Sequence, residues 1–117
     1  MASAESIVYG ALRSLVADRV YPDVAPLGAQ RPYITYQAVG GQDVNALGGP
    51  ADLQNSRMQI NVWADSRASA ATTMGAAFTA MTADAVKGIP IGAPVSTFEQ
   101  DTKLYGSRLD YSLWFKP

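Results

Sequence analysis

The chain has 117 residues, of which 48% are hydrophobic and 16% are charged, and its net charge is −1. A chain of this length is one domain and can form a hydrophobic core without disulfides or a structural metal. The nine lysine and arginine residues are scattered, whereas phosphate binding needs them clustered, which argues against a nucleic-acid-binding protein. The low charge leaves little repulsion between copies, so a monomer and a self-associating subunit both fit the composition.

No histidine and no cysteine occur in the sequence. This removes the commonest general base, the commonest metal ligand and the thiolate nucleophile. The carboxylate pairs Asp43 with Asp52 and Asp18 with Asp23 fall in predicted loops or turns, without the spacing of a metal-binding loop. The Gly48–Pro50 segment lacks the Lys-Ser/Thr pair of a phosphate loop. We therefore expect no catalytic residues, no cofactor and no metal.

Targeting and membrane segments are not predicted. The longest apolar runs fall short of the ~20 residues that a membrane-spanning helix needs. The first five residues lack the basic start and apolar stretch of a signal peptide. We expect a protein that stays in a cytoplasm or in a particle assembled there.

The first half of the chain predicts a helix, an extended segment, a strand and a loop. Apolar residues at helical spacing after Ser3 predict a helix over residues 4–18. Three prolines keep residues 20–32 extended. The β-branched and aromatic run Tyr33–Val39 predicts a strand, and the glycine-rich stretch Gln42–Leu53 predicts a loop.

The second half predicts three more elements and a final strand. Residues 57–64 alternate apolar and polar side chains and predict a half-buried strand. An alanine-rich helix follows over 67–83 after an Asp-Ser cap. A connection over 84–94 leads to a strand at 95–100, and strict alternation predicts the last strand at 109–116.

The predicted element order is therefore helix, strand, strand, helix, strand, strand. This order is typical of an α+β fold with a small, mainly antiparallel sheet of about four strands and two helices packed on one face. No repeat or linker divides the chain, so we expect one domain over residues 1–117. In the strand at 57–64 one face is apolar, and the other carries Arg57, Gln59, Asn61 and Trp63.

The two tryptophans, Trp63 and Trp114, fall by alternation on the polar faces of their strands. Either the long connections cover them or they anchor a subunit contact, because an exposed indole is unfavourable in water. A stacking platform for single-stranded nucleic acid would need basic residues between the rings, and acidic residues predominate nearby. We expect packing or an interface.

Three groups of motifs resemble, in order, the phage tail-completion (tail-to-head joining) family. The first comprises Val20–Pro26 and Arg31–Gln37, the second is Arg57–Ala64, and the third comprises Asp101–Tyr105 and Arg108–Trp114. The resemblance implies a non-enzymatic subunit of a ring, commonly a hexamer, that caps the tail tube and meets the head connector. It implies assembly in the bacterial host cytoplasm and a final place at the head-proximal end of the virion tail. The alternatives are a bacterial adaptor or regulatory module that binds protein through a sheet edge, and a small enzyme that uses carboxylates or tyrosine.

A ring built from head-to-tail contacts needs two different patches on each subunit. The sequence offers the 42–53 loop, whose apolar residues stand out in a polar stretch, and the polar face of the strand at 57–64. The predicted interface residues are Val44, Leu47, Arg57, Gln59, Asn61, Trp63 and Trp114.

Overall fold

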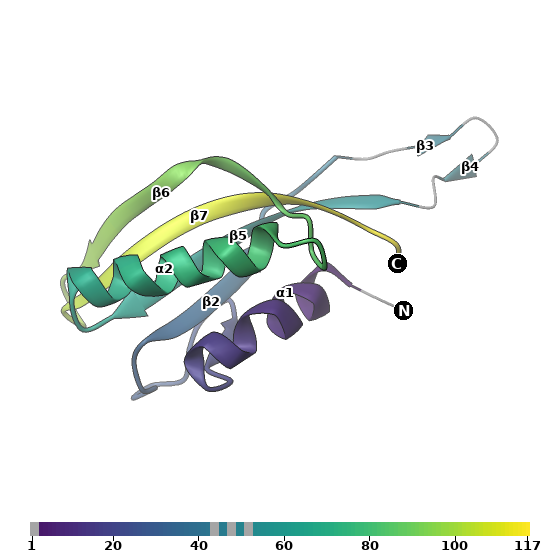
Figure 1. Cartoon of the computed structure of the whole chain (residues 1–117). Coiled ribbons are helices and arrows are strands. Elements are labelled where there is room, and N and C mark those ends of the chain that lie inside the picture. The colour runs from purple at the N-terminus through teal and green to yellow at the C-terminus, as the bar shows by residue number, and fades with distance from the viewer. Residues whose placement is uncertain (1–2, 43–44, 47–48, 51–52) are drawn as a thin grey trace.

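The computed structural model describes residues 3–42, 45–46, 49–50 and 53–117 (Figure 1). The elements follow in the order α1 (Ala4–Leu12), the 3₁₀ helix η1 (Arg13–Val16), β1 (Val20–Pro22), β2 (Tyr33–Ala38), β3 (Asn45–Ala46), β4 (Gly49–Pro50), β5 (Gln54–Ala64), α2 (Arg67–Thr82), β6 (Ile89–Glu99) and β7 (Leu104–Phe115). The α+β class and both predicted helices are confirmed. No helix among the described residues has the length and apolar character that crossing a membrane requires.

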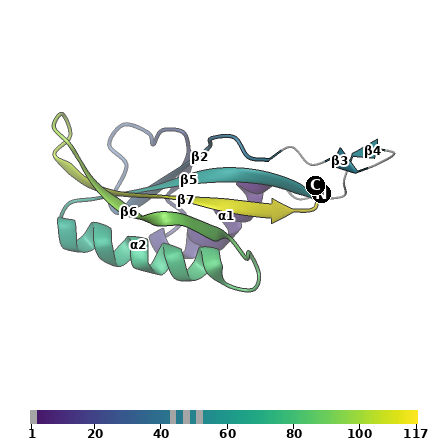
Figure 2. The same cartoon turned by 90° about the horizontal axis from the view of Figure 1, so that it is seen from above.

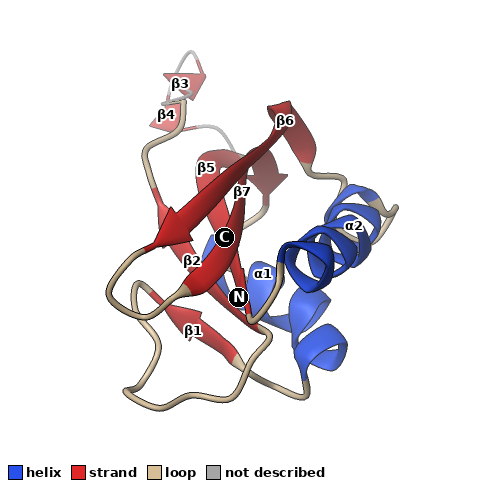
Figure 3. Ribbon diagram, turned by 90° about the vertical axis from the view of Figure 1, so that its left-hand side faces the viewer, coloured by secondary structure: helices blue, strands red, loops and turns tan. Residues whose placement is uncertain are grey.

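The main sheet has five strands in the order β1-β2-β5-β7-β6 (Figure 3). The strands β2, β5, β7 and β6 are antiparallel neighbours, whereas β1 pairs with β2 in parallel. The prediction of a four-stranded, mainly antiparallel sheet therefore missed β1 and its parallel pairing. Local sequence hides this strand because it is short and ends at Pro22, and an edge strand tolerates a residue without an N–H group.

The strand boundaries differ most from the prediction at β6 and β7, and β7 begins at Leu104 instead of Leu109. Residues 89–94 were expected to form a connection, yet they belong to β6 despite Pro90 and Pro94. The strand accommodates these prolines because it lies at the sheet edge, and a register shift interrupts its pairing with β7 between Ile91 and Val95. In the predicted 42–53 loop, the two-residue strands β3 and β4 form a separate antiparallel pair.

The first helix begins with a capping box in which Ser3 and Ser6 each accept a hydrogen bond from the other's backbone N–H at 3.1 Å. The α-helix ends at Leu12 and tightens into η1. Ala17 and Asp18 then adopt a left-handed conformation, which ends the helical segment two residues before the predicted limit.

Both α-helices pack on one face of the sheet, as predicted, and together they enclose the core (Figure 2). In β5, Met58, Ile60, Val62 and Ala64 are fully buried, while their neighbours point to the other side. In α2, Ala70, Met74, Ala77 and Met81 face the core and are buried, whereas Phe78 is 41% exposed. The two termini lie near each other at the end of the molecule from which β3 and β4 project (Figure 1).

Candidate interaction surface on the outer face of the sheet

The outer face is the side of the sheet turned away from the helices. The strand register places on it Tyr33, Thr35 and Gln37 of β2, Arg57, Gln59, Asn61 and Trp63 of β5, and Arg108, Asp110, Ser112 and Trp114 of β7. The predicted grouping of the four β5 side chains on one face is therefore confirmed. Trp114 shares this face, but it lies opposite Asn55, at the far end of the sheet from Trp63.

Polar and charged side chains occupy the centre of the outer face. The Arg57 Nε donates to Asp110 Oδ2 at 2.8 Å, and Asn61 Nδ2 donates to Gln59 Oε1 at 3.3 Å. Because the Arg57 side chain is 47% exposed, its ion pair adds little to stability. Arg108, on the neighbouring strand, is exposed and adds a positive charge to this region.

Trp63 packs closely on the next strand. Its cross-strand neighbour is Gly106, and a Cβ atom at Gly106 would lie 2.9 Å from the indole Cζ3 and overlap the Thr97 hydroxyl. A glycine is needed at this position because the ring occupies the space of a side chain. The close contact leaves Trp63 only partly exposed.

We expect Gly106→Ala to lower the free energy of unfolding by about 1–3 kcal/mol, since the added methyl group must displace the indole ring or Thr97. Chemical denaturation measures this loss. Gly75→Ala is the control, because Gly75 is an exposed helical glycine with open space around its Cα. That change should raise stability by up to about 1 kcal/mol. Equal effects of the two changes would contradict the packing described.

A hollow of about 460 Å³ opens beside Trp63, which we name the Trp63 hollow. Its floor is formed by Tyr33, Thr35, Asn61 and Trp63 of the outer face. One wall is the connection between β1 and β2, and the other is the end of the β6–β7 hairpin. The β1–β2 connection therefore lies beside Trp63 but does not fill the hollow, so the indole ring is only half covered.

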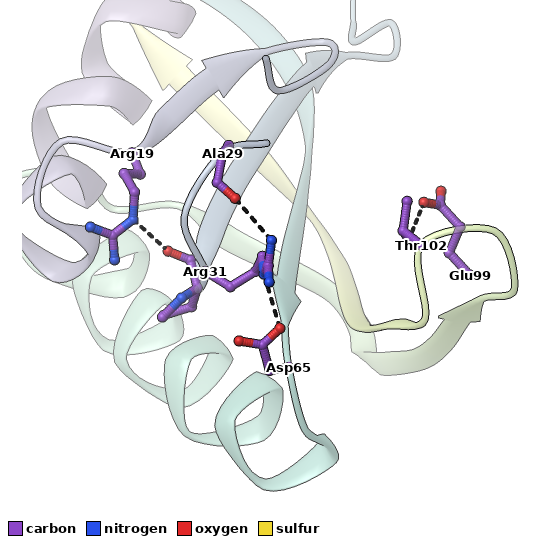
Figure 4. A network of polar contacts seen from close by, with 7 residues as sticks. Arg19, Ala29, Arg31, Asp65, Glu99 and Thr102 are labelled. Atoms are coloured by element: carbon purple, nitrogen blue, oxygen red, sulfur yellow. Dashed lines mark hydrogen bonds and ion pairs between the residues drawn. The ribbon is translucent and has the colours of Figure 1, made fainter. Parts of the chain in front are cut away.

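Several polar contacts fix the base of the β1–β2 connection (Figure 4). The Arg31 Nε donates to Asp65 Oδ1 at 2.9 Å, and its Nη1 donates to the carbonyl of Ala29 at 3.3 Å. The Arg19 Nε donates to the carbonyl of Pro32 at 3.0 Å. These bonds hold the wall of the Trp63 hollow against the sheet and the start of α2.

The ionisable groups around the Trp63 hollow are mainly acidic. Burial raises the pKa of the Tyr33 hydroxyl, and the negative charge of the Glu99 carboxylate raises it further. Asp23 also lines the hollow, and the charge of Arg31 is paired with Asp65. Among the described residues, no three acidic side chains gather to hold a metal ion. The arrangement is suited to binding a polar or basic group of another molecule.

Two predicted interface residues, Val44 and Leu47, lie outside the described residues. Trp114 is 36% exposed. Sequence reasoning missed the β1–β2 connection, where Val24 and Leu27 are highly exposed. The available signal was the pair of apolar residues inside a proline-rich segment, which had no periodicity to place them in a core.

The two helices enclose the core on one face of the sheet, and the other face carries polar side chains with the partly exposed Trp63 and Trp114. The chain is therefore a small α+β protein with surface available for macromolecular contacts. The family model described as "Tail completion protein gp17" matches residues 9–116. The chain therefore belongs to this family of phage tail-completion proteins and is a structural subunit of a phage tail.

A solved structure supports the fold independently. A chain of the structure described as "Virion of native gene transfer agent (GTA) particle" is similar to this chain, with a TM-score of 0.64 and 19% sequence identity. The alignment covers 98% of this chain and 96% of the other, so the likeness extends over nearly the whole domain. No curated protein matches the chain.

Proposed function

We propose that the chain is a non-enzymatic subunit of a ring that caps the tail tube and joins it to the head connector. The observation that carries this proposal is the family match over residues 9–116, which includes nearly the whole folded domain. The similar chain in a virion particle supports a place in an assembled particle. The subunits assemble in the bacterial host cytoplasm, and the ring, a hexamer in this proposal, ends at the head-proximal end of the tail.

Two unlike patches, one seen in the structure and one proposed from the sequence, support a ring. The outer face carries partly exposed Trp63 and a polar network, and the segment around Val44 and Leu47 supplies apolar residues elsewhere in the sequence. Two unlike patches that bind each other form a heterologous contact, which closes into a ring when the rotation between subunits permits it.

Electron microscopy of the purified chain mixed with purified tail tubes tests the joining role. We expect a ring or cap at one end of each tube. A monomer in free solution is compatible with the proposal, because the tube itself can nucleate assembly. Tube ends that stay bare at saturating protein would contradict the capping role.

Trp63→Ala and the double change Val44→Asp/Leu47→Asp should weaken ring assembly while the monomer stays folded. Aromatic anchors at interface centres contribute about 2 kcal/mol or more, which corresponds to roughly 30-fold weaker binding. Sedimentation and tube capping measure assembly, and circular dichroism measures folding. Leu15→Ala, a change of another exposed apolar residue, is the control. If both variants assemble normally, these surfaces are not the ring contacts.

The adaptor alternative requires a free sheet edge that can pair with a partner strand. The long edge strand β6 is poorly suited to this, because Pro90 and Pro94 lack N–H groups and the register shifts between Ile91 and Val95. A pull-down that recovers a host protein and no tail component would favour the adaptor. A small enzyme would instead lose a measurable turnover on some Asp→Asn or Tyr→Phe change that leaves the fold intact.

A further inference from the structure

The β1–β2 connection presents apolar side chains to solvent. In the loop of residues 23–29, Val24 is 78% exposed and Leu27 is fully exposed. Two backbone hydrogen bonds hold the loop in place. The N–H of Asp23 donates to the carbonyl of Tyr36 at 2.9 Å, and the N–H of Ala29 donates to the carbonyl of Pro26 at 3.1 Å. A held loop with exposed apolar side chains loses little conformational entropy when it binds a partner. The 23–29 loop is therefore a preorganised apolar projection that also carries the Asp23 carboxylate.

A complementary surface lies on the strand β6. Ile89, Ile91 and Val95 are 55%, 39% and 50% exposed. Ile91 and Val95 line a hollow of about 350 Å³ together with Arg57 and Arg108, which we name the β6 hollow. Arg57 is already paired with Asp110, so the exposed Arg108 leaves the β6 hollow with a positive charge.

The two surfaces lie at opposite edges of the same sheet. The 23–29 loop follows β1, and β1 and β6 are the two edge strands (Figure 3). A contact that joined copies by continuing the sheet would need unbroken N–H and C=O groups along β6, and Pro90 and Pro94 interrupt them. Contacts at this edge are therefore made through side chains.

We propose that the 23–29 loop of one copy of this chain docks into the β6 hollow of the next copy. Leu27 and Val24 then cover Ile91 and Val95, and Asp23 approaches Arg108. The exposed apolar side chains of the loop and of β6, and the opposite charges of Asp23 and Arg108, favour this partner. Because the surfaces differ and lie at opposite edges, the contact is heterologous and repeats around a ring. The inference rests on the proposed ring and adds this contact to the Trp63 and Val44/Leu47 surfaces proposed above.

Disulfide trapping tests the contact. The chain contains no cysteine, so only the introduced cysteines can form a disulfide. Tagged Leu27→Cys protein is mixed at high concentration with untagged Val95→Cys protein and oxidised with copper phenanthroline. The matched control mixes the same Leu27→Cys protein with Leu15→Cys protein, since Leu15 is another exposed apolar position. Electrophoresis separates the tagged–untagged dimer from each homodimer by mass.

We expect the 27–95 heterodimer to form at least about tenfold faster than the 27–15 heterodimer, since docking raises the local thiol concentration. An added Arg108→Glu change in the Val95→Cys protein should slow the reaction at low salt. Equal rates for the two mixtures would overturn the inference, as would Leu27→Cys homodimers that form as fast as the 27–95 dimer. Bare tube ends in the capping experiment would contradict the ring itself, so the two failures are distinguishable.

Discussion

Ile60→Ala is expected to lower the free energy of unfolding by about 2–5 kcal/mol. Ile60 has no exposed surface and lies in β5, between β2 and β7, where it belongs to the core that both helices cover. Removing its side chain beyond Cβ leaves a cavity. Because β5 is held by a strand on each side, it cannot shift to close this cavity. Urea denaturation followed by circular dichroism measures the loss.

Two neighbouring changes make this experiment a comparison of the two faces of the sheet. Ile60→Val should cost only about 0.5–1.5 kcal/mol, because it removes a single methylene. Gln59→Ala, on the outer face, should change stability by less than about 0.5 kcal/mol. Under the proposed function, Gln59→Ala affects assembly, whereas Ile60→Ala affects folding. A large stability loss from Gln59→Ala would contradict this separation of roles.

The parts of the fold that the sequence predicts well are those whose periodicity reports a local environment. The alternation in residues 57–64 places one face in the core, and the apolar residues on that face, Met58, Ile60, Val62 and Ala64, are fully buried. The alternation of β7 behaves in the same way, with Leu109, Tyr111 and Leu113 buried. In each case buried residues recur at a fixed interval along the chain. The sequence alone therefore predicts which residues are buried, whichever segments pack against them.

The missed strand β1 and the missed first part of β6 depend on distant partners. Val20 is buried in β1 because it pairs beside Ile34 of β2, and three residues are too few to show a period. In β6 most side chains are exposed, so the strand has no alternation, and its prolines argue against a strand when they are considered alone. Only the position of β6 at the edge of the sheet makes those prolines acceptable.

The candidate surface likewise has one part that the sequence predicts and another that it does not. Alternation alone places Arg57, Gln59, Asn61 and Trp63 on one face, which the register confirms. The Trp63 hollow and the β6 hollow arise where separate segments meet, so no single stretch of sequence predicts them. The exposure of Leu27 likewise follows from the path of the β1–β2 connection rather than from its composition.

The alternation of β7 places Tyr111 in the core but does not account for the surroundings of its hydroxyl group. Its side chain is fully buried, and its hydroxyl has no hydrogen-bond partner among the described residues. The Tyr111 ring lies beside the ring of Phe78, with the two ring centroids 6.5 Å apart. A buried phenol without a partner is much easier to keep neutral than ionised, and burial accordingly raises the pKa of Tyr111 to about 12.

Raising the pH from 10 to 12 should therefore destabilise the protein by about 2 kcal/mol through this one residue. In the unfolded chain the phenol ionises near pH 10, whereas in the folded chain it keeps its proton until about pH 12. Within this window the unfolded state binds fewer protons, so the free energy of unfolding falls as the pH rises. Below pH 10 the contribution is constant.

Tyr111→Phe isolates the effect, because Tyr33 and Tyr36 also have raised pKa values and add to the loss in the same direction. At pH 8 we expect the variant to be as stable as the unmodified chain or more stable by up to about 1 kcal/mol, since the change removes an unpaired buried hydroxyl. Between pH 10 and 12 the stability of the variant should fall less steeply. Denaturation curves at a series of pH values measure both profiles, and parallel profiles would assign the alkaline loss to other groups. A large loss at pH 8 would instead mean that the hydroxyl has a partner, such as a buried water, whose hydrogen bond stabilises the core.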